Sequence, residues 1–152
     1  MAAAANRLLK IVRPAYKLRF YKNLDLFNVV DCATARPVDP GVIVDDIIGI
    51  GRVSGTEEPR VGMSVRKSGR TSGLTSGDVT ATGVTIKVDL SDEESALFSD
   101  QAVADMLSKP GDSGSLVLNT DNKAVGLLFA GSETYCIFNR IQNVMDLLEI
   151  EF

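Results

Sequence analysis

The sequence predicts a domain built mainly from β-strands, with one α-helix at its C-terminal end. A glycine- and threonine-rich stretch at 61–86 has the alternation of a long β-hairpin. Apolar runs at 116–118 and 124–132 indicate two further strands, joined by an Asn-Thr-Asp-Asn turn at 119–122. Apolar residues then recur at helical spacing over 141–148, which predicts a helix packed on the strands.

The alternation within the long hairpin changes phase near its middle. Apolar residues occupy odd-numbered positions up to Ala81 and even-numbered positions from Val84 onward. A period of two changes phase only through an extra residue, so Gly83 is expected at a β-bulge or a sharp bend. Upstream, two prolines and a glycine within 36–41 should end a buried strand that carries Asp31.

The N-terminal region has a different composition. Residues 2–12 are rich in alanine and leucine with basic residues on one side, which predicts a short amphipathic helix ending before Pro14. Residues 16–20 alternate between large apolar and basic side chains, as a strand would. The basic residues either form the solvated face of these elements or bind an anionic surface.

Composition excludes several classes of protein. A chain of 152 residues with 45% apolar residues is expected to fold as one globular unit. A net charge of −4 argues against a general nucleic-acid binder, and no apolar run is long enough to span a membrane. Cys32 and Cys136 are too few for a disulfide framework and are expected to be small buried residues. Without a recognisable signal peptide, a cytoplasmic location is expected, unless a leader has been removed.

The segment Gly111-Asp112-Ser113-Gly114-Ser115 is the strongest candidate for a functional site. The two glycines permit a tight turn that exposes the Ser113 hydroxyl and brings the amides of Gly111 and Ser113 together as an oxyanion hole. An ordinary turn would use the same residue types. The chain contains no histidine, so a serine nucleophile here lacks its usual base.

Neighbouring charged residues offer two further hypotheses. A carboxylate at Asp112, turned inward behind the serine, needs a cation or several amide donors, and Arg70 and Lys67 are the candidate cations. Lys109 could act as the base of a Ser/Lys dyad only if it were buried, which its Ser-Lys-Pro context does not suggest.

Three motifs occur in the order used by the trypsin-like (chymotrypsin-fold) serine peptidases, particularly the bacterial ones. They are Lys-Ser-Gly-Arg-Thr-Ser-Gly-Leu-Thr-Ser-Gly at 67–77, the Ser113 loop and Val-Gly-Leu-Leu-Phe-Ala-Gly at 125–131. The chain resembles this family over roughly residues 25–150. The resemblance implies a chymotrypsin-like second β-barrel of about six antiparallel strands at 42–152, with residues 1–41 an N-terminal extension and a remnant of the first barrel.

The resemblance also assigns roles to individual residues. Ser113 matches the nucleophile, the amides of Gly111 and Ser113 match the oxyanion hole, and Asp31 matches the aspartate that orients the histidine. A strand of the primary specificity pocket matches Phe129, Ala130 and Gly131, and Lys109 lies at the rim of that pocket. If Asp31 and Ser113 flank the space of one imidazole ring, their side chains should lie roughly 6–9 Å apart.

These observations leave three hypotheses for function. The chain is a serine peptidase remnant or fragment that is inactive alone, a non-catalytic peptide-binding or assembly module, or a hydrolase completed by a histidine-bearing partner. Peptides or proteins are the expected ligands, and neither a cofactor nor a metal is expected. Absence of most of a first barrel would expose an apolar cleft, so self-association is also expected.

Overall fold

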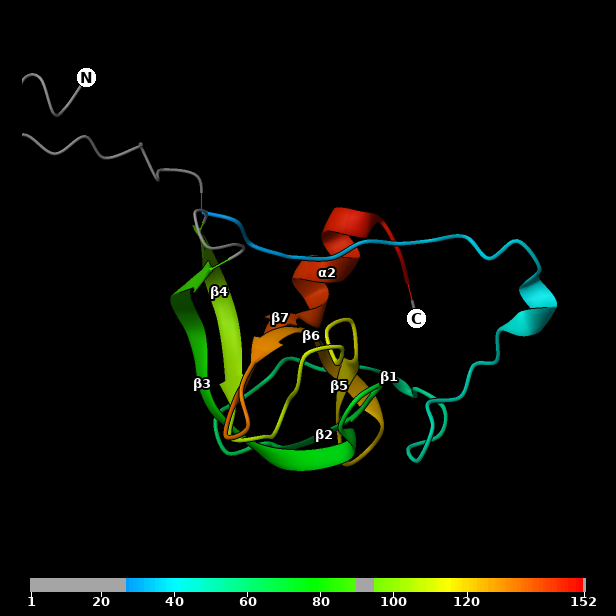
Figure 1. The fold of residues 1–152 in the computed structure, drawn as a ribbon, viewed down its shortest axis with the longest axis horizontal. Coiled ribbons are helices and arrows are strands. Elements are labelled where there is room, and N and C mark those ends of the chain that lie inside the picture. The colour runs from blue at the N-terminus through cyan, green and yellow to red at the C-terminus, as the bar shows by residue number, and fades with distance from the viewer. Residues whose placement is uncertain (1–26, 90–94, 152) are drawn as a thin grey trace, which may run out of the picture.

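In the described part of the chain, seven strands form one sheet that curls into a nearly closed ring, with a helix at its C-terminal end (Figure 1). The structure is a computed structural model, and it describes residues 27–89 and 95–151. Its elements are η1 (Pro40–Val42), β1 (Gly55–Thr56), β2 (Ser64–Gly69), β3 (Gly73–Asp89), β4 (Ser95–Ala104), β5 (Leu116–Asn119), β6 (Lys123–Gly131), β7 (Cys136–Arg140) and α2 (Ile141–Leu148). The expected mainly β domain with a C-terminal helix is confirmed.

The order of the strands shows how the ring closes. The sheet runs β1-β6-β5-β2-β3-β4-β7, and an additional pairing of β6 with β7 closes a ring of six strands, with β1 attached to its outside edge at β6. All pairs are antiparallel except β1 with β6, which is parallel. The two-residue β1 is therefore an addition to the six antiparallel strands that were expected.

The long hairpin lies where the sequence places it and carries the predicted irregularity. β2 and β3 pair from Ser64 with Asp78 to Gly69 with Gly73. Along β3 the register with β4 shifts between Ala81 and Val84, and Gly83 between them has φ +68°. Because a side chain is strained at this φ, glycine fits the position, and the bulge predicted there is confirmed.

The core lies inside the ring and is made from alternate residues of the strands. The buried apolar cluster consists of Val65, Val79, Ala102, Ala104, Met106, Val117, Val125, Leu128, Cys136 and Phe138. Both cysteines are free thiols. Cys136 is fully buried on β7, as expected, but the expectation is wrong for Cys32, which is only half-buried and lies outside any strand. Burial raises the pKa of the Cys136 thiol to about 11, so this sulfur behaves as a small apolar group.

One predicted strand is absent. After a single bridge between Asn28 and Phe98, residues 29–39 form no regular strand, and most of them, Asp31 included, are exposed. The buried strand expected to carry Asp31 is therefore wrong. Within the described residues this segment has no continuous backbone ladder with another strand, so side chains hold it instead.

The segment that leads from Asp31 to β1 extends away from the ring, and η1 lies at its outer end (Figure 1). The helix and strand expected within residues 2–20 lie outside the described residues. The division at residue 41 between two parts of the chain stays a prediction. In the described part of the chain, no helix has the length and apolar character needed to cross a membrane.

Candidate active site

The Ser113 loop follows β4 and turns sharply into β5. Gly111 and Gly114 have φ +99° and +88°, a region that favours glycine. A Cβ at Gly111 would lie 2.5 Å from the hydroxyl oxygen of Thr71, so the close approach to the β2–β3 turn excludes any side chain there. Ser113 itself is exposed, as a nucleophilic serine must be to reach a substrate.

Hydrogen bonds fix the orientation of two peptide groups in this loop. The Thr71 hydroxyl donates to the carbonyl of Pro110 at 2.8 Å, and both Nα and Oγ of Ser115 donate to the carbonyl of Asp112. In a trans peptide the N–H points opposite to the C=O, so the N–H groups of Gly111 and Ser113 point away from these contacts.

Neither of these two N–H groups has an acceptor within the described part of the chain. Two unpartnered donors with one residue between them are what an oxyanion hole requires. The convergence of both donors on one point stays a prediction.

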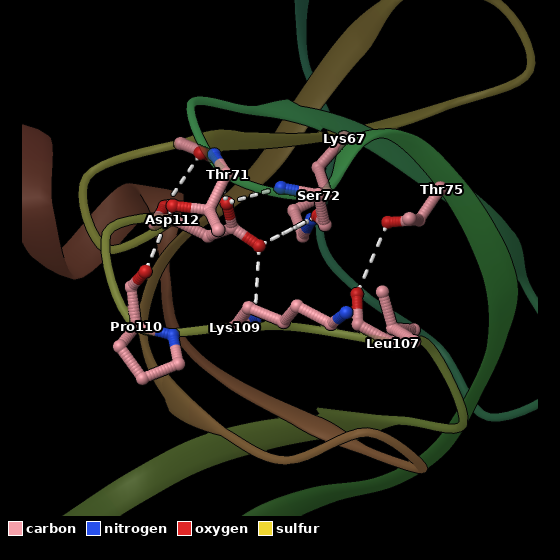
Figure 2. A network of polar contacts seen from close by, with 9 residues as sticks. Lys67, Thr71, Ser72, Thr75, Leu107, Lys109, Pro110 and Asp112 are labelled. Atoms are coloured by element: carbon pink, nitrogen blue, oxygen red, sulfur yellow. Dashed lines mark hydrogen bonds and ion pairs between the residues drawn. The ribbon is translucent and has the colours of Figure 1, made fainter.

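Behind the serine, the carboxylate of Asp112 is fully buried in a polar network (Figure 2). Its Oδ1 accepts from the backbone amides of Thr71 and Ser72, at 2.8 and 3.0 Å. Its Oδ2 accepts from the Ser72 hydroxyl at 2.6 Å, the Lys109 amide at 2.9 Å and the Lys67 ammonium at 3.1 Å. The Lys67 side chain is also fully buried, so two buried charges offset each other.

This network explains the ionisation state of the carboxylate. Burial by itself raises the pKa of Asp112, but hydrogen bonds from Ser72, Lys109 and Thr71 outweigh burial and hold that pKa well below the ordinary value. Asp112 is therefore ionised at neutral pH and binds the β2–β3 turn to the Ser113 loop. Of the two cations expected beside it, Lys67 makes the contact. Arg70 is exposed and makes none of these bonds.

The Ser113 hydroxyl has no base beside it in the described residues. Its Oγ donates to the backbone carbonyl of Phe129 at 3.2 Å. A carbonyl oxygen accepts a hydrogen bond but does not remove a proton at neutral pH, and the whole chain lacks histidine. Lys109 is exposed, as expected at the rim of a pocket, and no hydrogen bond joins its side chain to Ser113.

Asp31 is held near the same part of β6 as the serine. The Asn139 side chain accepts from the Asp31 amide and donates to the Asp31 carbonyl, both at 3.0 Å. The same Asn139 amide group donates to the carbonyl of Leu127, two residues before Phe129, whose carbonyl accepts from Ser113. Asn139 thus links the backbone of Asp31 to Leu127, while Ser113 contacts Phe129 of the same strand. The separation of the Asp31 and Ser113 side chains stays a prediction.

The three residues matched to the specificity pocket lie at the end of β6. The ring of Phe129 packs against Phe98 of β4, with their centroids 5.0 Å apart. At Gly131 a Cβ would lie 2.7 Å from the carbonyl of Tyr135 and 3.0 Å from the buried hydroxyl of Ser108. Gly131 therefore allows the strand to pass close to the segment that precedes the Ser113 loop.

Sequence reasoning missed the polar residues that support this region. Gln101 and Asn139 lie opposite each other in β4 and β7, both fully buried. Gln101 donates to the carbonyl of Val29 at 2.7 Å, and Asn139 holds Asp31. The sequence did contain a sign of this role, because both residues interrupt apolar strands and buried polar residues usually have specific partners. What the sequence does not reveal is which segment they bind.

Comparisons with known proteins agree with this geometry. The family model described as Peptidase S7, flavivirus NS3 serine protease, matches residues 80–142, which include the Ser113 loop. No curated protein matches this chain in sequence.

Several solved bacterial proteases share its fold. The chymotrypsin of Cellulomonas bogoriensis superposes with a TM-score of 0.58 at 22% identity, over 66% of this chain and 55% of its own. Protease A of Thermobifida fusca gives 0.60 at 21% identity, over 70% and 57%. The Nocardiopsis protease gives 0.58 at 19% identity, over 66% and 53%.

These comparisons define the fold. The ring of strands is a chymotrypsin-type β-barrel, and the matching family model covers less than half of the chain. It spans little more than half the length of the solved proteases it matches.

Proposed function

We propose that this chain is a serine-peptidase scaffold that retains the nucleophile loop and the oxyanion donors but has no base, and that it is inactive as an isolated chain. The observation that carries the proposal is the environment of Ser113. Its hydroxyl donates to a carbonyl, and the chain has no histidine to take its proton.

The expected loss of activity follows from the chemistry of serine nucleophiles. Removal of one member of a catalytic triad costs several orders of magnitude in rate, although an oxyanion hole retains a small advantage over water. Neither lysine near the loop replaces the base. Lys67 is buried and bound to Asp112, and Lys109 is exposed. Peptide hydrolysis by this chain should therefore be close to background.

Hydrolysis of a fluorogenic peptide library by the purified chain tests this proposal. The wild type and Ser113→Ala are expected to give the same rate, since the hydroxyl is not activated. Turnover by the wild type well above that of Ser113→Ala would show that the chain has a working base and would overturn the proposal.

A second candidate function, a non-catalytic peptide-binding module, is supported by the edge of β6. The Gly114 amide donates to the carbonyl of Leu128, and the Leu128 amide donates to the carbonyl of Ser115. The edge of β6 that faces β5 is therefore hydrogen-bonded as far as Leu128. Beyond Leu128, no described strand pairs with this side of β6 as far as Gly131. An extended peptide could add to the sheet there, with its end directed towards the Ser113 loop. Completion by a histidine-bearing partner remains a third candidate, which would add a base to the same site.

Self-association is also proposed, because the segment 27–48 exposes many large apolar side chains. They are Phe27, Val29, Val38, Val42, Ile43, Val44 and Ile48. An apolar surface of this kind is more often covered by another copy or a partner than left in water. Sedimentation velocity across a concentration series should show dimers or larger species. A strictly monomeric chain at all concentrations would contradict this.

A further inference from the structure

We propose that residues 27–31 exchange between two copies of this chain, so that the segment of each copy lies on the barrel of the other. The inference rests on the self-association proposed above and names the contacts that form it. Its basis is a short segment at one end of the described chain, held on β4 and β7 and followed by a long connection that extends away from the ring (Figure 1).

The first part of the segment is attached to β4 as a very short added strand. The amide of Asn28 donates to the carbonyl of Leu97, and the amide of Ser99 donates to the carbonyl of Asn28, both at 2.9 Å. These bonds form a single parallel bridge between Asn28 and Phe98. A bridge of this size attaches the segment only weakly, because even a complete isolated hairpin is at best marginally stable in water.

Two buried side-chain amides hold the remainder of the segment by its backbone. Gln101 of β4 donates to the carbonyl of Val29 at 2.7 Å. Asn139 of β7 accepts from the amide of Asp31 and donates to its carbonyl, both at 3.0 Å. None of residues 27–31 is itself buried. The segment can therefore leave the barrel, and the same segment of a second copy can replace it, without repacking of the core.

The connection over residues 32–46 is suited to carry this exchange. Within the described residues its hydrogen bonds are local contacts of Asp39, apart from an exposed ion pair between Asp45 and Arg52. About fifteen residues of extended chain span up to about 50 Å. The connection is therefore long enough to place the segment on a neighbouring barrel, and few contacts have to break when it changes direction.

The energy balance of the exchange depends on this connection. The segment makes the same hydrogen bonds on its own barrel and on a second one, which is why exchange of identical elements is a low-cost route to dimers. The connection exposes four large apolar side chains in the single chain, namely Val38, Val42, Ile43 and Val44. In a two-fold symmetric pair the two connections run between the barrels and cover these side chains, and their burial offsets the loss of translational freedom.

Exchange gives each barrel an Asp31 from the other copy. Asn139 links the backbone of Asp31 to Leu127 of β6, the strand whose Phe129 carbonyl accepts from Ser113. In the exchanged pair, the acidic residue held at this strand and the serine that contacts the strand therefore belong to different chains.

Two variants with complementary defects test the exchange. Asn139→Ala removes the side chain that holds Asp31, and Asp31→Pro removes the amide that donates to Asn139. An exchanged pair of one chain of each variant contains one fully intact contact, whereas neither variant alone can form one. The mixture should associate about tenfold more tightly than either variant alone in sedimentation velocity. In copies that associate without exchange, each chain keeps its own defect and mixing brings no gain.

Asn143→Ala is the matched control, because its side chain bonds Asp100 and leaves Asn139 in place. Mixed with Asp31→Pro, it should associate no more tightly than Asn143→Ala does alone. If mixing Asn139→Ala with Asp31→Pro gives no gain while the wild type forms dimers, exchange is overturned and self-association stands. A wild type that is monomeric at all concentrations overturns both.

A second measurement uses the wild type and so does not depend on the folding of the variants. Unlabelled chain and chain labelled with ¹⁵N and ¹³C are mixed and brought to a concentration at which dimers predominate. Isotope-filtered NOE spectra should then show contacts between the Asp31 amide of one chain and the Asn139 side chain of the other. Contacts confined to a single chain would contradict the exchange.

Discussion

The back and the front of the Ser113 loop are built in different ways. At the back, the carboxylate of Asp112 and the ammonium of Lys67 are fully buried, and five donors fix the carboxylate. At the front, the Ser113 hydroxyl is exposed and donates to a carbonyl, and Asp31 is exposed on a segment held by side chains. The carboxylate that anchors the loop is thus buried with the barrel core, while Ser113 and Asp31 lie at the surface.

This difference explains how a nucleophile loop can stay ordered without a base. The energy that fixes the loop comes from the buried ion pair and its hydrogen bonds, none of which involves the reacting groups. These contacts therefore hold the loop whether or not a base lies beside Ser113. Substitutions at the back of the loop should therefore change global stability, whereas substitutions at the front should have local effects.

The largest effect is expected from removal of the buried cation. Lys67→Met leaves Asp112 buried without its counter-charge, and should lower the free energy of unfolding by about 3 kcal/mol. Lys123→Met is the control, because Lys123 is partly exposed and 3.5 Å from Glu57, and should cost at most about 1 kcal/mol. Urea denaturation measures both. An equal loss of unfolding free energy in the two variants would show that the buried pair contributes no more to stability than the exposed one.

A smaller and local effect is expected at the front. Asn139→Ala removes two hydrogen bonds to the backbone of Asp31, and should speed hydrogen exchange of the Asp31 amide by about tenfold. Exchange at Thr71, behind the loop, should not change beyond the effect of global stability. The control is Asn143→Ala, whose side chain bonds Asp100 instead. If Asp31 exchanges equally in all three proteins, Asn139 does not hold the segment.

The smallest effect is a change in pH dependence. The pKa of Asp112 is lowered in the folded chain, so its ionisation stabilises the fold above the unfolded pKa of about 4, and this stabilisation is lost as the pH falls below that value. Ser72→Ala removes the hydroxyl that donates to Asp112 and accepts from Lys67, and it raises the folded pKa of Asp112. The variant should be less stable by about 1 kcal/mol at pH 7. This difference in stability should narrow only as the pH falls through the raised folded pKa of the variant, which still lies below the ordinary value for aspartate.

Ser64→Ala removes an exposed hydroxyl that bonds Asp78, and it serves as the control. Its stability should stay close to that of the wild type across the whole pH range. If the difference in free energy of unfolding between the wild type and Ser72→Ala does not depend on pH, ionisation of Asp112 does not account for that difference.

Much of the barrel could be predicted from the sequence because its signals are local. Alternation defined the long hairpin, a change of phase located the bulge at Gly83, and helical spacing defined α2. Each of these signals depends on residues close together in the chain. The Ser113 loop was also predictable, since its glycines have positive φ and its serine is exposed.

The contacts that organise the site were harder to predict because they join distant segments. The sequence offered Lys67 and Arg70 equally as partners of Asp112, and only the inward alternation of β2, which buries Val65, Lys67 and Gly69, decides between them. Asp31 was expected on a buried strand because the resemblance to the serine peptidases implies one there. It lies instead on an exposed segment, 108 residues from the asparagine that holds it.

The central claim, that the loop is complete except for its base, can be tested by adding the base from solution. A fluorophosphonate that labels activated serines should not modify the chain in buffer at neutral pH. Imidazole added at high concentration should allow labelling, and peptide mass spectrometry should locate the label on Ser113. Labelling should be slower in Asp31→Asn if Asp31 orients the ring, and absent in Ser113→Ala. Rapid labelling without imidazole would show that a base is already present, and no labelling of Ser113 with imidazole would show that the loop is not a competent nucleophile site.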